Sequence, residues 1–147
     1  VRTDVRRVVS NAAESVEPTM ANRRLVLDSS DGEPLCVLGD PRELEQVFVN
    51  LFTNARDASP EGGEIVCAVR RDGDSVRTTI ADRGVGLPSN AADKLFQPFF
   101  TTKKSGGTGL GLAISRDIIR RHGGDIQLNP REGGGAEATV TLPLGGS

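Results

Sequence analysis

Glycines gather just before a helical pattern in the stretch SGGTGLGLAISRDIIRRHGGD, residues 105–125. The cluster consists of Gly106, Gly107, Gly109 and Gly111. A glycine inside a helix costs about 1 kcal/mol relative to alanine, so the cluster needs a physical reason. At the start of a helix, glycines leave backbone N–H groups uncovered, and these donors together with the helix dipole form a cradle for phosphate. The preceding Lys103 and Lys104 add positive charge, and we therefore predict a phosphate site here.

The glycine cluster differs from two common phosphate-binding motifs. No Lys-Ser or Lys-Thr pair follows it at the spacing of a P-loop, and it does not read G-x-G-x-x-G after a strand. A P-loop site and a dinucleotide site are therefore both disfavoured. A flexible hinge is an alternative, and it is compatible with phosphate binding because a lid over a ligand also needs hinges.

A polar stripe runs along the helix expected over residues 40–58. Its members are Gln46, Asn50, Asn54 and Asp57. Asparagine is a poor residue for a helix interior because its amide competes for the backbone, and two of them four residues apart place two carbonyl oxygens on one face. Such oxygens suit Mg²⁺, which takes few ligands from protein and the rest from phosphates and water. Taken alone, the stripe fits a metal site and an ordinary solvated helix face equally well.

Asp82 lies at the end of a strand whose other residues on the same face suit a core. Those residues are Val76, Thr78 and Ile80. A carboxylate beside an apolar pocket is costly unless it is hydrogen-bonded, and the exocyclic amine of adenine is a fitting donor. Gly84 and Gly86 follow, and they let the backbone approach a flat ring closely. The alternative is an ordinary glycine turn beside a surface aspartate.

The helices that must position these groups follow from apolar periodicity. The first is predicted over residues 3–16, with an apolar side formed by Val5, Val8, Val9, Ala12, Ala13 and Val16. The second, residues 40–58, begins with Asp40 as N-cap, Pro41 as first helical residue and Glu43 closing a capping box. Its core-facing stripe is Leu44, Val47, Phe48, Leu51, Ala55 and Ala58. The third, from about 109 to 121, ends at the C-capping Gly123 and Gly124.

Short strands are predicted between these helices. They cover residues 23–27 and 34–38, a hairpin of 64–70 and 75–82 around the turn RDGD, and residues 125–129 and 136–142. Residues 87–107 lack a periodic segment, and connections of that length are usually functional or disordered. Helices interleaved with mostly antiparallel strand pairs predict an α+β fold in which helices cover one face of a sheet.

Composition and charge exclude several classes of function. The 147 residues are 36% hydrophobic and 26% charged, which is typical of one globular domain. A net charge of −2 and the absence of Trp and Tyr argue against nucleic acid as the main partner. With no apolar run of membrane-spanning length and no signal peptide, we expect a cytoplasmic domain that makes no membrane contact, whether or not its parent protein is anchored. Cys36 and Cys67 are expected as buried thiols, and the lone His122 excludes zinc motifs that need two histidines.

Taken in order, these motifs resemble those of the catalytic ATP-binding domain of sensor histidine kinases, within the Bergerat-fold ATPase superfamily. QVFVNLFTNARDAS is similar to the N box, DRGVGLP to the first glycine box, KLFQPFFTTK to the phenylalanine box and GGTGLGLAI to the second glycine box. HGGDI after the third helix fits as well. The NARDA and PFFTTK segments are most similar to the branch containing nitrogen-regulatory and oxygen-sensing kinases. The resemblance covers nearly the whole chain as one domain.

The resemblance implies a two-layer α/β sandwich, in which a mixed sheet of about five strands packs against three helices. It implies ATP and Mg²⁺ as cofactors, with Asn54 as the principal Mg²⁺ ligand, Asn50 nearby, and both counted as catalytic. Asp82 would accept a hydrogen bond from the adenine amine, and Gly84 and Gly86 would line the base pocket. Residues 87–107 would be the ATP lid. Gly107, Gly109 and Gly111 would cradle the phosphates with the help of Thr108, and Lys103 would contact them from the lid. Leu110 is counted among the ATP-binding positions.

Some positions depart from the family pattern. The last strand has Ala136 and Ala138 where a small hydroxyl residue and an aromatic are common, and we expect the loss of the hydroxyl to weaken the water-mediated hold on adenine. Asp57 belongs to the ATP-binding positions, but many kinases carry a basic residue there, and an aspartate cannot make the phosphate contact of a basic side chain. The neighbouring Arg56 is basic.

The phosphate acceptor implied by the resemblance is a histidine on a helical dimerisation and phosphoacceptor domain, with a response regulator downstream. We interpret the chain as lacking that helical domain, with residues 1–16 as the last part of the connection to it. His122 follows a helix and fits a structural or capping role instead. We therefore expect a catalytic fragment of a dimeric kinase, which binds Mg-ATP but does not phosphorylate itself.

Three alternative functions stay open on the same scaffold. ATPase relatives place a glutamate, as general base, one turn before the Mg-binding asparagine. The matching residue here is Asn50, whose amide cannot usefully accept a proton near neutral pH, so slow ATP turnover is expected. An anti-sigma-factor-type serine kinase is the second alternative, although the long lid with its phenylalanines favours the histidine kinase. A nucleotide-binding module without a catalytic role is the third.

Overall fold

The computed structural model describes residues 2–28, 34–82, 111–130 and 135–145. The expected lid, residues 87–107, lies outside these ranges. In chain order, the elements are β1 (Arg2–Asp4), α1 (Val5–Val16), the 3₁₀ helix η1 (Glu17–Thr19), β2 (Arg24–Asp28), β3 (Cys36–Leu38), α2 (Pro41–Ala58), β4 (Glu64–Asp72), β5 (Ser75–Ala81), α3 (Gly111–Arg121), β6 (Asp125–Pro130) and β7 (Ala136–Pro143).

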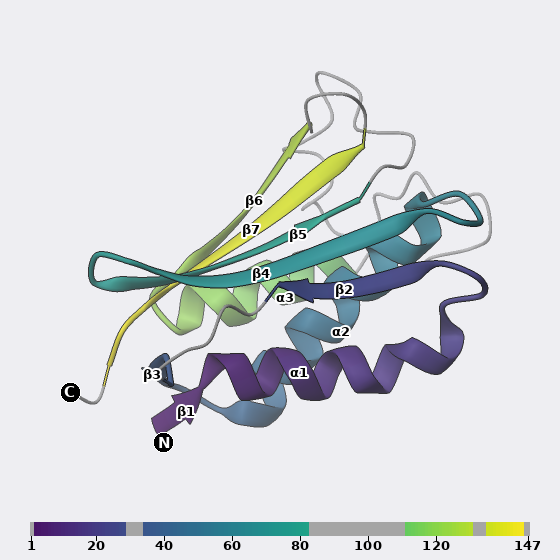
Figure 1. Cartoon of the computed structure of the whole chain (residues 1–147). Coiled ribbons are helices and arrows are strands. Elements are labelled where there is room, and N and C mark those ends of the chain that lie inside the picture. The colour runs from purple at the N-terminus through teal and green to yellow at the C-terminus, as the bar shows by residue number, and fades with distance from the viewer. Residues whose placement is uncertain (1, 29–33, 83–110, 131–134, 146–147) are drawn as a thin grey trace.

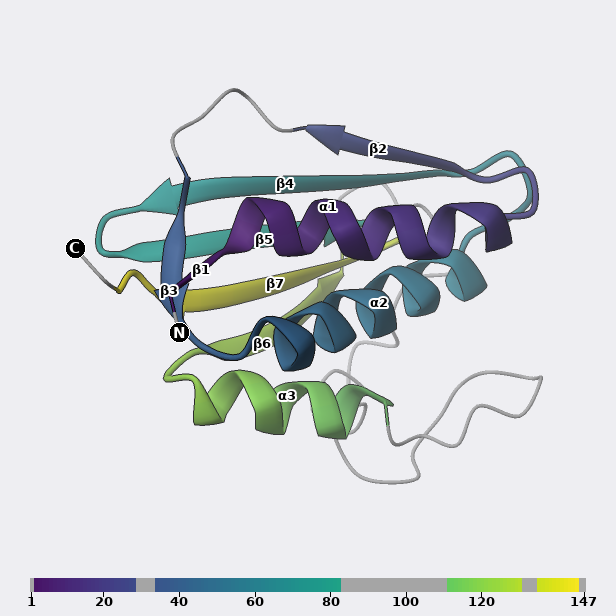
Figure 2. The same ribbon diagram turned by 90° about the horizontal axis from the view of Figure 1, so that it is seen from below.

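Five strands form one mixed sheet in the order β2-β4-β5-β7-β6. β2 runs parallel to β4, whereas the other neighbouring pairs are antiparallel. The three α-helices of the described residues all lie on one face of this sheet (Figure 1). Viewed from that side, α1, α2 and α3 lie next to one another (Figure 2). The predicted two-layer sandwich of a five-stranded mixed sheet and three helices is confirmed.

The core lies between the sheet and the helices, as the apolar stripes predict. All six apolar residues predicted for the first helix are buried on α1. On α2 the prediction is wrong at two positions, because Phe52 is fully buried although it lies outside the predicted stripe, and Ala58 is only half-buried. The buried face of α2 is wider than the predicted stripe because this helix packs against both α1 and the sheet.

At the start of α2, the predicted N-cap forms but the predicted capping box does not. Asp40 is the N-cap, and its Oδ1 accepts hydrogen bonds from the backbone N–H groups of Arg42 and Glu43. The prediction that Glu43 closes a capping box is wrong, because the N–H of Asp40 donates to Nε2 of His122 at 3.1 Å. The carboxylate of Glu43 instead accepts from Arg121 at 3.2 Å. Contacts with the end of α3 therefore replace the local bond.

The sequence did not indicate the second, two-stranded sheet formed by β1 and β3. The first helix is predicted from residue 3, but α1 begins at Val5 because Asp4 is its N-cap and accepts from the N–H of Arg6 at 3.0 Å. Thr3 therefore lies in a strand, and its hydroxyl donates to the carbonyl of Gly39 at 3.0 Å. This pairing places the N-terminal strand beside the segment that leads into α2.

The predicted turns at the β4–β5 hairpin and at the end of α3 are confirmed. Asp72 pairs with Ser75, which leaves a two-residue turn in which Gly73 has φ +61°. Gly123 follows α3 with φ +86°, and the N–H of Gly124 donates to the carbonyl of Ile119 at 2.9 Å. Both left-handed positions favour glycine.

Cys67 is buried on β4 and Cys36 is half-buried on β3, and both are free thiols. Burial raises the pKa of the Cys67 thiol to about 12, so it stays protonated near neutral pH. Within the described ranges, no helix is long and apolar enough to cross a membrane. The same ranges hold no cluster of three or more His, Cys, Asp and Glu residues that could bind a metal ion.

Candidate functional site

The polar stripe of α2 contacts α3 at Asn50. The Nδ2 of Asn50 donates to Oγ of Ser115 at 3.1 Å, and its Oδ1 accepts from Nε2 of Gln46 at 3.0 Å. Ser115 is completely buried, whereas Asn50 is half-buried. The asparagine therefore connects the middle of α2 to the first half of α3.

Gly111, the first residue of α3, also lies beside Asn50. A methyl group at this glycine would lie 4.0 Å from Cγ of Asn50, which is ordinary van der Waals contact. The fold thus brings the end of the glycine cluster next to the asparagine stripe. Asn54 lies one turn further along α2, is half-buried, and makes no side-chain hydrogen bond to the described part of the chain. Its carbonyl oxygen is therefore available to a ligand.

Asp82 follows β5 on the face that is covered by the helices, and it is only 6% exposed. Val76, Thr78 and Ile80 are buried on the same face, as predicted. The Oδ1 of Asp82 accepts from the N–H of Ala136 at 3.2 Å, and the N–H of Asp82 donates to the carbonyl of Ala136 at 2.9 Å. A backbone donor from β7 thus offsets part of the cost of burying this carboxylate.

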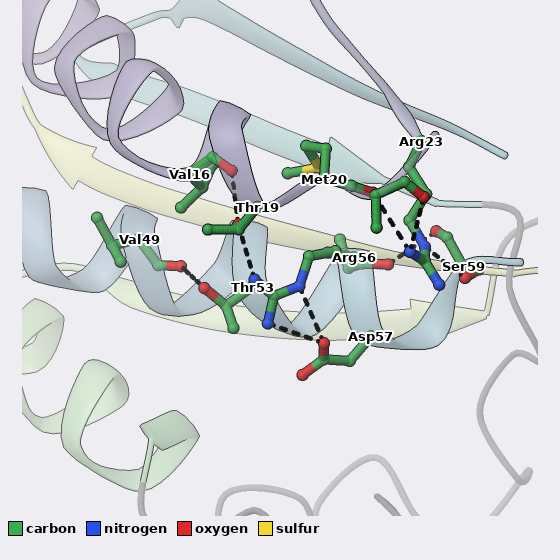
Figure 3. Close-up of polar contacts among 11 residues, drawn as sticks. Val16, Thr19, Met20, Arg23, Val49, Thr53, Arg56, Asp57 and Ser59 are labelled. Atoms are coloured by element: carbon green, nitrogen blue, oxygen red, sulfur yellow. Dashed lines mark hydrogen bonds and ion pairs between the residues drawn. The ribbon is translucent and has the colours of Figure 1, made fainter. Parts of the chain in front are cut away.

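The guanidinium of Arg56 points toward Asp57 and Thr19 (Figure 3). Its Nε and NH2 nitrogens lie 3.0 Å from Oδ1 of Asp57, and NH1 donates to Oγ1 of Thr19 at 2.8 Å. In the same region, Nε of Arg23 donates to the carbonyl of Ser59 at 2.8 Å, just beyond the end of α2. The charge of Asp57 is therefore compensated within the protein, and Arg56 also connects α2 to η1.

His122 holds the other end of α3 against α2. Its Nε2 accepts from the N–H of Asp40, and its Nδ1 lies 2.7 Å from the carbonyl oxygen of Ile118. Since a carbonyl can only accept, this arrangement requires a neutral ring with its proton on Nδ1. A methyl group at Gly39 would come within 2.5 Å of the ring, so the glycine allows this close approach. The predicted structural role of His122 is confirmed.

Asp125 connects α3 to β6 through charged contacts. Its Oδ1 accepts from Nε of Arg116 at 3.1 Å, from Nε of Arg120 at 3.2 Å and from the N–H of Ile126 at 2.8 Å. Partial burial by itself raises the pKa of Asp125, but the hydrogen bonds from Arg116, Ile126 and Arg120 outweigh it and hold the pKa below its usual range. The carboxylate is therefore stabilised in its charged form.

The predicted site residues divide between described and undescribed parts of the chain. Asn50, Asn54, Asp57, Asp82 and Gly111 are described. The others lie outside the described residues: Gly84, Gly86, Lys103, Gly107, Thr108, Gly109 and Leu110. Sequence reasoning missed Ser115 as the partner of Asn50. The available signal was a small polar residue one turn after Gly111, on the helix face that also carries Ile118 and Ile119.

A family model described as "Histidine kinase-, DNA gyrase B-, and HSP90-like ATPase" matches residues 39–146. The chain belongs to this family. The sensor histidine kinase ZraS of Klebsiella oxytoca is 37% identical over 145 residues, which cover 97% of this chain and 31% of that protein. Sporulation kinase E of Bacillus subtilis (strain 168) is 36% identical over 131 residues, which cover 88% of this chain and 18% of that protein. The chain therefore spans less than a third of the length of these relatives.

Solved structures of histidine kinases have the same fold. The nucleotide-free catalytic domain of the histidine kinase ThkA superimposes with a TM-score of 0.88 at 31% identity, covering 98% of this chain and 95% of that one. ThkA in complex with the response regulator protein TrrA gives a TM-score of 0.85 at 28% identity, and the match covers 99% of this chain and 42% of that one. Full-length ShkA in complex with AMPPNP gives a TM-score of 0.86 at 28% identity, and the match covers 100% of this chain and 31% of that one.

The described residues fit a nucleotide and a magnesium ion. Asn54 offers an amide oxygen, which is the type of donor that Mg²⁺ prefers. Asp82 offers a buried carboxylate to a donor such as the adenine amine. Gly111 has no side chain to cover the backbone at the start of α3, where the helix dipole favours an anion.

Proposed function

We propose that this chain binds Mg-ATP beside α2 and the start of α3, and transfers the γ-phosphoryl group to a histidine on a separate dimerisation and phosphoacceptor domain. The observation that carries the proposal is that the asparagine stripe of α2 lies beside the start of α3, through the Asn50–Ser115 hydrogen bond and the nearness of Gly111. Membership of an ATPase family supports ATP as the ligand. The histidine kinase names of the relatives support histidine as the acceptor, and the AMPPNP complex of ShkA supports a triphosphate nucleotide.

Each described site residue has a distinct task in this proposal. Asn54 would hold Mg²⁺ through its amide oxygen, and Asp82 would accept a hydrogen bond from adenine, while the amides at the start of α3 would orient the phosphates. Mg²⁺, when bound, neutralises phosphate charge. In the transfer, a lone pair of the acceptor imidazole forms a bond to the γ-phosphorus. The bond from that phosphorus to the bridging oxygen breaks, ADP leaves with the electron pair, and the imidazole N–H proton passes to solvent.

Transfer to protein is favoured over hydrolysis because no general base for water stands at position 50. Asn50 has an amide, which does not accept a proton near neutral pH, and its two ends are hydrogen-bonded to Gln46 and Ser115. We therefore expect very slow ATP hydrolysis by the chain alone. A fast, Mg²⁺-dependent rate from pure protein would contradict this expectation.

The proposed partners follow from the same reaction. The phosphoacceptor domain of the parent kinase, dimeric in the full protein, would supply the histidine. A response regulator would then receive the phosphoryl group, and the complex of ThkA with TrrA supports this class of partner. The proposed site of action is the cytoplasm, where ATP is available.

The proposal is tested by adding the phosphoacceptor domain of the parent kinase to this chain with γ-labelled ATP. We expect label on that domain that is lost in acid, as phosphohistidine is, and no label on this chain alone. Acid-stable label would indicate a serine kinase instead. Absence of label despite ATP binding would indicate a nucleotide-binding module without a catalytic role.

A further inference from the structure

Asn50 uses both ends of its side-chain amide within the protein. Nδ2 donates across the helix interface to Ser115, and Oδ1 accepts from Gln46 one turn earlier on α2. Both polar atoms of the Asn50 amide are therefore engaged by protein side chains. In the structure, its nitrogen faces α3 and its oxygen faces Gln46.

Ser115 depends on this contact more than an exposed serine would. Its side chain is completely buried, so its hydroxyl needs a partner inside the protein. Ser115 lies one helical turn after Gly111, and a methyl group at Gly111 would lie 4.0 Å from Cγ of Asn50. One α2 side chain is therefore hydrogen-bonded to the first half of α3 and lies near the first residue of that helix.

Asn54 differs from Asn50 in this respect, although both belong to the stripe that suggests metal ligands. No residue in the described ranges hydrogen-bonds the side chain of Asn54. Asn50 is committed to the packing of two helices, whereas Asn54 keeps its oxygen available. The two asparagines thus have different tasks.

We propose that Asn50 and Ser115 are positioning residues, and that Asn54 alone of the two asparagines binds Mg²⁺. This inference rests on the proposed function. The Asn50–Ser115 bridge would fix the start of α3, where the phosphates bind, relative to Asn54, where the metal binds. It would act on the phosphate end of the nucleotide and not on the metal ion itself.

A double-mutant cycle on the whole chain tests the bridge. The affinity of AMPPNP is measured by calorimetry, with Mg²⁺ and with EDTA, for the wild type, Asn50→Ala, Ser115→Ala and the double variant. We expect each single variant to weaken binding about three- to tenfold, the size of one lost hydrogen bond, and the double variant to lose no more than one of them. The affinity ratio between Mg²⁺ and EDTA should stay at the wild-type value in all three variants and fall toward one only in Asn54→Ala.

Ser59→Ala is the matched control, because Ser59 is a buried serine near the end of α2 whose hydroxyl donates to the carbonyl of Ala55, away from the bridge. It should leave nucleotide affinity unchanged. A second readout needs no nucleotide: Ser115→Ala should shift the side-chain amide NMR signal of Asn50, assigned by its loss in Asn50→Ala, and Ser59→Ala should not.

Three outcomes would overturn the inference. Additive losses in the double variant would mean that the two residues act separately. If the affinity ratio between Mg²⁺ and EDTA fell toward one in Asn50→Ala but stayed at the wild-type value in Ser115→Ala, Asn50 would be a metal ligand. If Ser115→Ala changed neither the AMPPNP affinity nor the NMR signal of Asn50, the hydrogen bond between Asn50 and Ser115 would not exist in solution. Failure of the wild type to bind AMPPNP would instead overturn the proposed function, so the two failures are distinguishable.

Discussion

Asp82 and Ala136 are joined by two hydrogen bonds, one in each direction between the end of β5 and the start of β7. The carboxylate of Asp82 is therefore oriented by the backbone N–H of residue 136 and not by the side chain at that position.

The first prediction concerns the role of Asp82 in recognising adenine. In Asp82→Asn, the new side-chain oxygen can still accept from Ala136, but the new amide nitrogen replaces a charged acceptor with a donor. We expect ATP affinity to fall about tenfold or more, since hydrogen bonds to charged groups are worth about 1.5–3 kcal/mol. Calorimetry measures the affinity, and thermal unfolding checks that the variant is folded.

Inosine triphosphate provides the control for this prediction because it lacks the exocyclic amine. The wild type should prefer ATP over inosine triphosphate, and Asp82→Asn should reduce that preference. Equal affinity of ATP for the wild type and the variant would contradict the assignment of Asp82.

The second prediction separates the metal from the nucleotide. Asn54→Ala removes an amide oxygen that has no partner in the described part of the chain. We expect the variant to bind Mg-ATP much more weakly than the wild type and metal-free ATP with nearly the same affinity, because only the metal contact is lost. Equal losses with Mg²⁺ and with EDTA would mean that Asn54 is not a ligand.

The third prediction concerns the two thiols. Burial raises the pKa of Cys67 to about 12, so almost no thiolate is present at pH 8. In native protein, Ellman's reagent should react readily with Cys36 and only very slowly with Cys67, and both should react in denaturant. The Cys36→Ser variant, without denaturant, should therefore release almost no coloured product from Ellman's reagent. Rapid reaction of this variant without denaturant would contradict the burial of Cys67.

The fourth prediction concerns acid stability. The pKa of Asp125 is lower in the folded chain than in the unfolded chain. Its charged contacts therefore stabilise the fold fully at pH values above the pKa of about 4 that the residue has in the unfolded chain. That contribution is lost as the pH falls through the folded pKa. Asp125→Asn should be less stable than the wild type at pH 7, and the difference should shrink below about pH 4. Denaturant titrations at several pH values measure it, and a difference that does not change with pH would contradict the prediction.

The sequence predicts those parts of the fold that are encoded locally. The apolar period of α1 and α2, the turn at Gly73 and the glycine cap at Gly123 are properties of neighbouring residues, and the structure confirms them. Asp82 was placed correctly because alternation along β5 decides which face it occupies.

Contacts between distant segments could not be predicted in this way. Pairing of Arg2 with Leu38 in the small sheet, and of Asp40 with His122 in place of a local capping box, depends on how the elements pack. The same limitation applies to Asn50, whose partner Ser115 lies 65 residues later in the chain. Helix periodicity alone makes Asn50 and Asn54 equivalent members of one stripe. The family resemblance makes Asn54 the principal ligand, but only the packing of α3 identifies the partner of Asn50.

The most direct test of the central proposal is a crystal structure of the chain with AMPPNP and Mg²⁺. We expect electron density for the metal within about 2.1 Å of the Asn54 amide oxygen, phosphates at the start of α3, and the adenine amine within hydrogen-bonding distance of Asp82. A nucleotide bound elsewhere on the molecule, or a metal with no contact to Asn54, would contradict it.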